Sequence, residues 1–229
     1  MIKLKLVLFD LDGTLADTAV DIARVTNRVL ADADRPPLSL DEVRAQVSFG
    51  ARALLRAGFG GTLSDAELEP LLAQLFAYYA EAPAIDTTAF PGLAECIHEF
   101  AAAGSRWGVV TNKPEALAVP IVAALGIKPE PICIIGGDTF TRKKPDPLPL
   151  LEACRKAGIA PDEAIYIGDA EIDARAASAA GMPLAVAGFG YAPARAEACR
   201  WPGNVRYAAD TDELGRILGL GEKVSAQAS

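Results

Sequence analysis

The sequence lacks the cysteine and histidine patterns that mark several protein classes. Its four cysteines, Cys96, Cys133, Cys154 and Cys199, are widely spaced and include no Cys-x-x-Cys pair. This spacing argues against a disulfide framework or a zinc site and predicts free thiols in a reducing compartment. The single histidine, His98, lies in a helical pattern, where a lone histidine is more typical of a surface position than of a ligand.

Positive charge and long apolar runs are also scarce. The chain has 22 Lys and Arg residues against 30 Asp and Glu residues, a net charge of -8, and no basic patch stands out. Nucleic acids and anionic membrane surfaces are therefore poor candidates for partners. No segment approaches membrane-spanning length, and the apolar run at the start is cut by Lys5 and ends in acid, unlike a signal peptide. We expect a cytoplasmic protein.

What is present is enough apolar sequence for a folded core. The chain has 229 residues, of which 51% are hydrophobic, so it can form one large domain or one domain with an insertion. The run "LKLVLF" near the start predicts a buried strand. Residues 17–82 then show helical spacing, interrupted by turn signals such as Pro36-Pro37 and Gly60-Gly61, and contain no strand-like run.

From residue 90 onward, predicted helices and strands alternate. The predicted strands are "RWGVVT", "ICIIG", "AIYIGD" and "PLAVAG", each preceded by a helical pattern. Such alternation indicates βαβ units and a parallel sheet with helices on both faces. We therefore predict an α/β fold, a doubly wound Rossmann-like core from residues 1–15 and 84–229, with an all-helical cap domain inserted at residues 16–83. The polar tail is expected to fray.

Polar side chains follow the predicted strands where each strand ends. These residues are Asp10 and Asp12 after the first strand, Thr111 and Asn112 after "RWGVV", Lys143 and Lys144 in "RKKPDP", and Asp169 and Asp173 around the end of "AIYIG". Parallel sheets bind ligands at the carboxyl ends of their strands, so these groups should meet at one rim. Clustered carboxylates favour Mg²⁺, and Mg²⁺ with a lysine suits a phosphate. Lys144, beside a proline, is favoured over a solvated Lys143.

The first pair of acids suggests covalent phosphoryl transfer. Side chains at i and i+2 share a face of a strand, which places Asp10 beside Asp12 near a common metal. Asp10 can attack phosphorus, and Asp12 can protonate the leaving oxygen and later deprotonate water. Gly13 permits a tight turn, and the backbone N–H groups at Gly13 and Thr14, with Asn112, are expected to bind phosphate oxygens.

Four motifs in this order resemble the haloacid dehalogenase superfamily, and specifically its phosphatases with a helical cap after the first strand. They are "DLDGT", "VVTNK", "RKKPDP" and "GDAEID". The resemblance implies that Asp10 is the nucleophile, Asp12 the acid/base and Thr111 a phosphate ligand. It further implies that Lys144 stabilises phosphoryl charge. Asp169 would bind the metal together with Asp10 and Asp12, and Asp173 would support Asp169 or pair with Lys144.

Further segments resemble phosphoglycolate phosphatases in particular. They are "VTNKP", "GGDT", "KPDPLPLLEAC" and, in the cap, "VSFGARALL". This resemblance implies a Mg²⁺-dependent phosphatase whose favoured substrate is 2-phosphoglycolate, a small-molecule partner. The fourth motif departs from the usual pattern, because Ala170 stands where Ser or Thr is common, which puts metal affinity in question.

Alternatives remain open at this point. Another sugar-phosphate phosphatase or a phosphomutase on the same fold also fits the motifs. Asp12 argues against a dehalogenase. The intact acid set argues against a catalytically inactive binding protein on this fold. In the cap, Gly50 and Arg52 are candidates for substrate contact, Arg52 through a substrate carboxylate. The competing interpretation places Arg52 and Arg56 on a solvated helix face. The sequence does not distinguish a monomer from a dimer.

Overall fold

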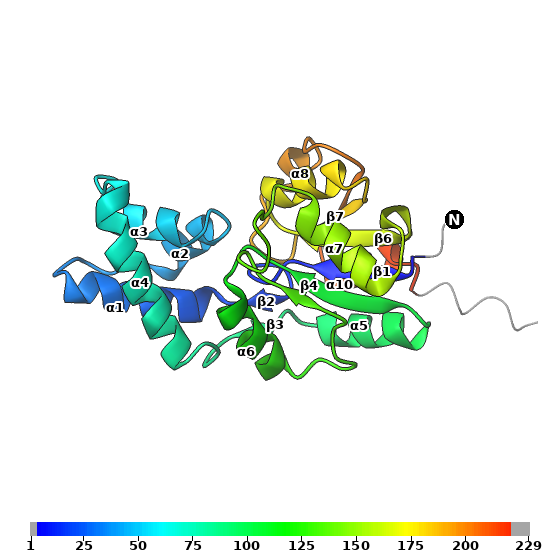
Figure 1. The fold of residues 1–229 in the computed structure, drawn as a ribbon, viewed down its shortest axis with the longest axis horizontal. Helices are drawn as coiled ribbons and strands as arrows, with labels where there is room; N and C mark the ends of the chain where they lie inside the picture. Colours follow the sequence, from blue (N-terminus) through cyan, green and yellow to red (C-terminus); the bar gives the residue numbers. More distant parts are fainter. Residues whose placement is uncertain (1–3, 221–229) are drawn as a thin grey trace, which may run out of the picture.

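The computed structural model describes residues 4–220, and a six-stranded sheet forms its larger part (Figure 1). Its strands are β1 (Leu6–Phe9), β4 (Arg106–Val110), β5 (Ile134–Ile135), β6 (Ala164–Gly168), β7 (Leu184–Ala187) and β8 (Val205–Ala208). They lie in the order β5-β4-β1-β6-β7-β8, and every neighbouring pair is parallel. β1 is therefore central, and the chain order reverses beside it.

Helices cover both faces of this sheet because alternate residues of its strands point to opposite sides. Val7 and Phe9 belong to a core shared with α5 (Leu93–Ala102), α6 (Glu115–Leu125) and α10 (Thr211–Ile217). Leu6 and Leu8 belong to a second core shared with α7 (Leu148–Ala157), α8 (Glu171–Ala179) and α9 (Arg195–Ala198). The predicted α/β architecture with a doubly wound parallel sheet is confirmed.

Four further helices form a bundle beside the sheet, at the left of Figure 1. They are α1 (Ala19–Asp32), α2 (Leu40–Val47), α3 (Ala51–Gly58) and α4 (Asp65–Glu81), and they pack on one another. Capping boxes at Ser39 and Ser64 fix the starts of α2 and α4. We propose that this bundle is the cap domain, with the bounds 16–83 that the sequence predicts.

Two short strands join the bundle to the sheet. β2 (Ala16–Asp17) pairs antiparallel with β3 (Thr88–Ala89), so both crossings of the chain lie side by side. The buried carboxylate of Asp21 accepts hydrogen bonds from the backbone N–H groups of residues 85–87, which fixes the returning segment on α1. Neither strand is predicted from the sequence, because two residues are too few to show alternation.

The sequence patterns also do not predict β8 (Val205–Ala208), α9 or α10. The polar tail, for which fraying is expected, lies outside the described residues. Among residues 4–220, no helix has the length and hydropathy that a bilayer crossing requires.

Candidate active site

The ends of three adjacent strands bring the predicted polar residues together. Asp10 follows β1, Thr111 follows β4 and Asp169 follows β6, and β1 pairs with both of the other strands. All three strands are parallel, so their carboxyl ends share one edge of the sheet. This edge is where the chain order reverses, the usual place for a ligand in an open α/β sheet.

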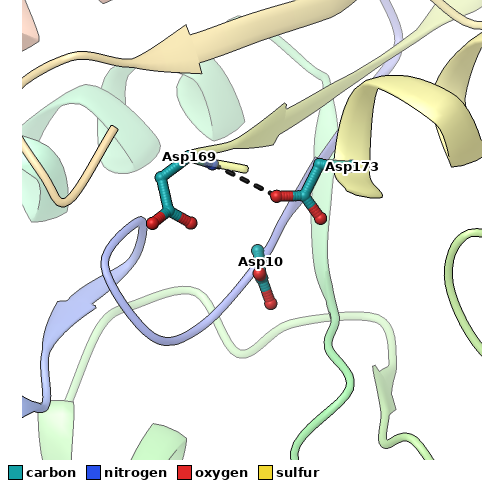
Figure 2. Close-up of side chains that lie close together, drawn as sticks. All are labelled: Asp10, Asp169 and Asp173. Atoms are coloured by element: carbon teal, nitrogen blue, oxygen red, sulfur yellow. Dashed lines mark hydrogen bonds between the residues drawn. The ribbon is translucent and has the colours of Figure 1, made fainter. Parts of the chain in front are cut away.

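Three carboxylates gather at this edge (Figure 2). Oxygen atoms of Asp10, Asp169 and Asp173 all lie within 4.8 Å of one another. The Asp173 Oδ2 accepts the backbone N–H of Asp169 at 3.2 Å, the dashed line in Figure 2, and that of Ala170 at 3.1 Å. Asp173, in the first turn of α8, therefore binds the two backbone N–H groups that precede the helix, and no side chain at Ala170 accepts an N–H of that turn.

A buried lysine joins two of these acids. The Lys144 side chain is 1% exposed, and its Nζ lies 3.0 Å from Asp10 Oδ2 and 2.7 Å from Asp173 Oδ1. It also donates to the Tyr166 hydroxyl at 2.7 Å, and that hydroxyl donates to the Val110 carbonyl. Burial lowers the pKa of Lys144, but the Asp10 and Asp173 carboxylates outweigh it and raise this pKa to about 12. Lys144 is a fixed positive charge.

The ionised forms of Asp10 and Asp169 are destabilised by their surroundings. Burial raises the pKa of Asp10 to about 6, although the Lys144 ammonium opposes the rise. Burial and the neighbouring carboxylates Asp173 and Asp10 raise the pKa of Asp169 well above its ordinary value. Without a further positive charge, this cluster holds more negative charge than its surroundings stabilise.

Asp12 has a separate set of partners. Its Oδ1 accepts the Thr18 hydroxyl at 2.6 Å and the Lys113 ammonium at 2.9 Å. Lys113 also donates to the hydroxyl of Tyr79 on α4, at 3.1 Å. Burial opposes the charge of Lys113, but Asp12 and Tyr79 keep its pKa above the ordinary value. The carboxylate of Asp12 is therefore oriented by the Thr18 hydroxyl and by Lys113, and Lys113 in turn contacts Tyr79 of the helical bundle.

The donor set fits a hard divalent cation. The site holds two ammonium groups, those of Lys113 and Lys144, and four carboxylates, those of Asp10, Asp12, Asp169 and Asp173. With all four acids ionised, two negative charges are left uncompensated. Oxygen ligands and this charge suit Mg²⁺. Both oxygens of Asp173 are already bound by Lys144 and by backbone N–H groups, which leaves Asp10 and Asp169 as the carboxylates available to a metal.

The loop after β1 uses its own N–H groups. Gly13 N–H donates to the Ala16 carbonyl at 3.0 Å and Thr14 N–H to the Leu11 carbonyl at 3.3 Å, so neither is free for the phosphate oxygens expected there. The Thr14 hydroxyl donates to Asp169 Oδ1 at 3.1 Å and orients that acid. Gly13 has a φ of +74°, and a Cβ there would lie 2.7 Å from Asp169 Oδ2.

Thr111 and Asn112 line the same cavity as Asp10 and Asp12. The Thr111 hydroxyl accepts the N–H of Lys113 at 3.2 Å. The Asn112 amide donates to the Lys144 carbonyl at 3.0 Å, while its own buried oxygen has no partner among the described residues. Asn112 therefore holds the loop that carries Lys144 and does not cap α6.

The cavity of about 820 Å³ continues from this edge to the helical bundle. Gly50 and Arg52 line it, and the Arg52 guanidinium is bound by Glu69 at 2.5 Å. The Ser48 hydroxyl reaches across and donates to Asp169 Oδ2 at 2.9 Å. The bundle thus contacts the acids of the sheet directly.

Neither Lys113 nor Tyr166 is assigned a role from the sequence. Tyr166 is buried, and its hydroxyl binds Lys144. A signal existed, because a buried tyrosine hydroxyl needs a polar partner, and "TNK" already placed Lys113 at a strand end.

Comparisons with known proteins identify relatives of this chain. Residues 7–187 match the model of the haloacid dehalogenase-like hydrolases. The N-acetylmuramic acid 6-phosphate phosphatase of Pseudomonas aeruginosa is 39% identical over 203 residues, which cover 89% of this chain and 90% of that protein. A phosphoglycolate phosphatase of Xanthomonas campestris pv. campestris is 39% identical over 199 residues, covering 87% of this chain and 90% of that protein.

Solved structures are similar along nearly the whole chain. A predicted phosphoglycolate phosphatase from Haemophilus somnus has a TM-score of 0.79 and 29% identity, and the match covers 93% of this chain and 99% of that one. Together with the family match and the relatives, this shows that the expected resemblance is correct. The chain belongs to the haloacid dehalogenase-like hydrolase family and is an enzyme similar to its phosphoglycolate phosphatases.

Proposed function

We propose that this protein is a Mg²⁺-dependent phosphatase that hydrolyses small phosphate monoesters through an aspartyl-phosphate on Asp10. The observation that carries the proposal is the buried contact of Lys144 with Asp10, at 3.0 Å, beside the acid cluster of Asp169 and Asp173. It combines a nucleophile, a fixed positive charge and oxygen ligands for a cation at the end of one strand.

In the first step, Asp10 attacks phosphorus while the bond from phosphorus to the ester oxygen breaks. Asp12, in its protonated form, gives a proton to the leaving alkoxide. Lys144 and Thr111 stabilise the charge on the phosphoryl oxygens. Asp10, the Asp12 carbonyl and Asp169 would hold Mg²⁺, which would neutralise phosphate charge when bound.

In the second step, water attacks the same phosphorus atom and Asp10 leaves as a carboxylate. Asp12 accepts the proton of that water, as the carboxylate that Thr18 and Lys113 bind in this structure. Asp173 keeps Lys144 in place through a 2.7 Å ion pair and takes no part in either bond change.

The activities for which the relatives are named support two candidate substrates. The phosphoglycolate phosphatases support 2-phosphoglycolate, which the sequence resemblance also favours. The phosphatase from Pseudomonas aeruginosa supports N-acetylmuramic acid 6-phosphate, and the large cavity favours this second candidate. Both are phosphate monoesters of alcohols that carry a carboxylate, so the same chemistry serves either.

Phosphate release from these esters, measured with Mg²⁺ and with EDTA, tests the proposal. Wild-type protein should release phosphate only with the metal. Asp10→Asn should lose at least about 10³-fold in kcat because the nucleophile is gone. Asp138→Asn is a matched control, since Asp138 is an exposed carboxylate that lines the same cavity outside the acid cluster. Full activity of Asp10→Asn, or activity in EDTA, would refute the mechanism.

A further inference from the structure

The cavity has two chemically different ends. At the sheet, Asp10, Asp12, Lys113 and Lys144 line it with charge. At the helical bundle, its wall is apolar and is made mainly by α3 and α4. A phosphate bound at the charged end would direct the rest of its ester toward this apolar wall.

Helix α4 presents one face to the cavity at helical spacing. Leu72, Phe76 and Tyr79 follow one another along this face, Ala73 lies beside them, and Leu54 of α3 completes the wall. The nearby charges on this side, those of Arg52 and Glu69, are bound to each other at 2.5 Å. The wall therefore offers apolar contact to a substrate more than it offers charge.

An exposed aromatic ring stands at the same end. Phe49, in the loop between α2 and α3, lines the cavity although the residue is 74% exposed. Among residues 4–220 it stacks on no other aromatic ring. A phenylalanine ring left in water forgoes the favourable transfer of its apolar surface out of water, and contact with a bound apolar face would recover it.

The size of the cavity points the same way. Its volume of about 820 Å³ falls within the range of sites that enclose drug-sized molecules, roughly 300–1,000 Å³. A two-carbon acid bound through its phosphate would leave Phe49 and the α4 face in contact with water alone.

We propose that Phe49 and the α4 face at Leu72, Ala73 and Phe76 form a subsite for a ring-sized body with an apolar face. The substrate class is then a phosphate monoester of a substituted sugar in preference to a two-carbon acid. This inference rests on the proposed phosphatase activity. It adds the kind of leaving group that the enzyme prefers.

The test compares kcat/KM for two carboxylated phosphate monoesters, N-acetylmuramic acid 6-phosphate and 2-phosphoglycolate. They differ in the size of the group that is esterified to phosphate. Wild-type protein should prefer the ring-sized ester by about tenfold or more, as expected for one good aromatic contact plus apolar burial. Phe49→Ala removes the ring, and Ala73→Phe fills the subsite from an exposed position. Each should lower kcat/KM for the ring-sized ester about tenfold and leave 2-phosphoglycolate within about twofold.

Two control variants make the same changes elsewhere. Ala77→Phe adds a ring to an exposed position one turn further along α4 that does not line the cavity, and Ile85→Ala removes an exposed apolar side chain outside it. Both should behave as wild type.

Other outcomes contradict the inference in distinguishable ways. Preference for 2-phosphoglycolate, with no selective effect of Phe49→Ala and Ala73→Phe, would overturn the subsite but keep the phosphatase. Equal losses on both esters would also overturn it. Absence of phosphate release from either ester by wild-type protein with Mg²⁺ would contradict the proposed function, and the inference with it.

Discussion

At the residue scale, the Lys144 ammonium is held by groups from three different parts of the chain. Asp10 follows β1, Tyr166 lies in β6, and Asp173 lies in α8. Two of these partners are acids and compensate its charge. The third is a hydroxyl that also satisfies the buried Val110 carbonyl, so it connects the charge to the backbone at the end of β4.

Tyr166→Phe should therefore affect stability and turnover together. The buried Val110 carbonyl loses its donor and Lys144 loses an acceptor, which should lower the free energy of unfolding by about 1–3 kcal/mol. Turnover should fall severalfold because Lys144 keeps its two ion pairs but is less well oriented. Urea unfolding and steady-state kinetics measure both effects.

Tyr207→Phe is the matched control. Tyr207 is a half-buried tyrosine whose hydroxyl makes only a 3.4 Å contact with the Pro193 carbonyl, away from the acid cluster. It should cost less than about 0.5 kcal/mol and leave turnover unchanged. Equal effects of the two variants would show that the Tyr166 hydroxyl has no special role.

At the element scale, the two chain crossings between the bundle and the sheet are fixed by carboxylates. Asp17 in β2 binds Arg44 of α2 and the Tyr191 hydroxyl. Asp21, at the start of α1, accepts three backbone N–H groups and the Thr87 hydroxyl from the segment before β3. Burial opposes the charge of Asp21, but its bonds to Arg24, Thr87 and the backbone hold its pKa below the ordinary 3.8.

Asp21→Asn should destabilise the fold in a pH-dependent way. The native carboxylate has a lowered pKa, so its contribution is fully present above the unfolded value of about 4 and is lost as pH falls through the native value. The variant should lose about 2 kcal/mol at pH 7. This difference should shrink as the solution is acidified below about pH 4. Urea titrations of both proteins across pH measure it, and a difference that stays constant with pH would contradict the role of the charge.

Some secondary-structure elements can be predicted from the sequence and others cannot. Short apolar runs followed by polar residues predicted the central strands and placed Asp10, Thr111 and Asp169 at one edge, because parallel topology brings the carboxyl ends of neighbouring strands together. β2 and β3 have two residues each, too few for any periodicity. The partners of Lys113 and Tyr166 depend on packing between distant segments, and local patterns carry no information about such contacts.

At the scale of the whole molecule, the acid cluster stores repulsion that a cation would relieve. Adding Mg²⁺ should raise the melting temperature, by several degrees at saturating metal, since about 2.7 kcal/mol is gained at 100 times Kd. Asp169→Asn removes one of the two available carboxylates and one like charge. It should melt higher than wild type without metal and lose the Mg²⁺ shift.

Calorimetric scans with Mg²⁺ and with EDTA measure both parts of that prediction. Asp138→Asn should keep the full Mg²⁺ shift, because Asp138 lies outside the cluster. A full shift in Asp169→Asn would exclude this cluster as the metal site.

The most direct test of the account is to locate the phosphoryl group during turnover. The reaction with Mg²⁺ and a phosphate monoester is quenched in acid within milliseconds, and the peptides are analysed by mass spectrometry. The aspartyl-phosphate mechanism predicts a phosphorylated peptide that carries the modification on Asp10, and none from Asp10→Asn. A phosphoryl group on any other residue, or undiminished turnover by Asp10→Asn, would contradict it.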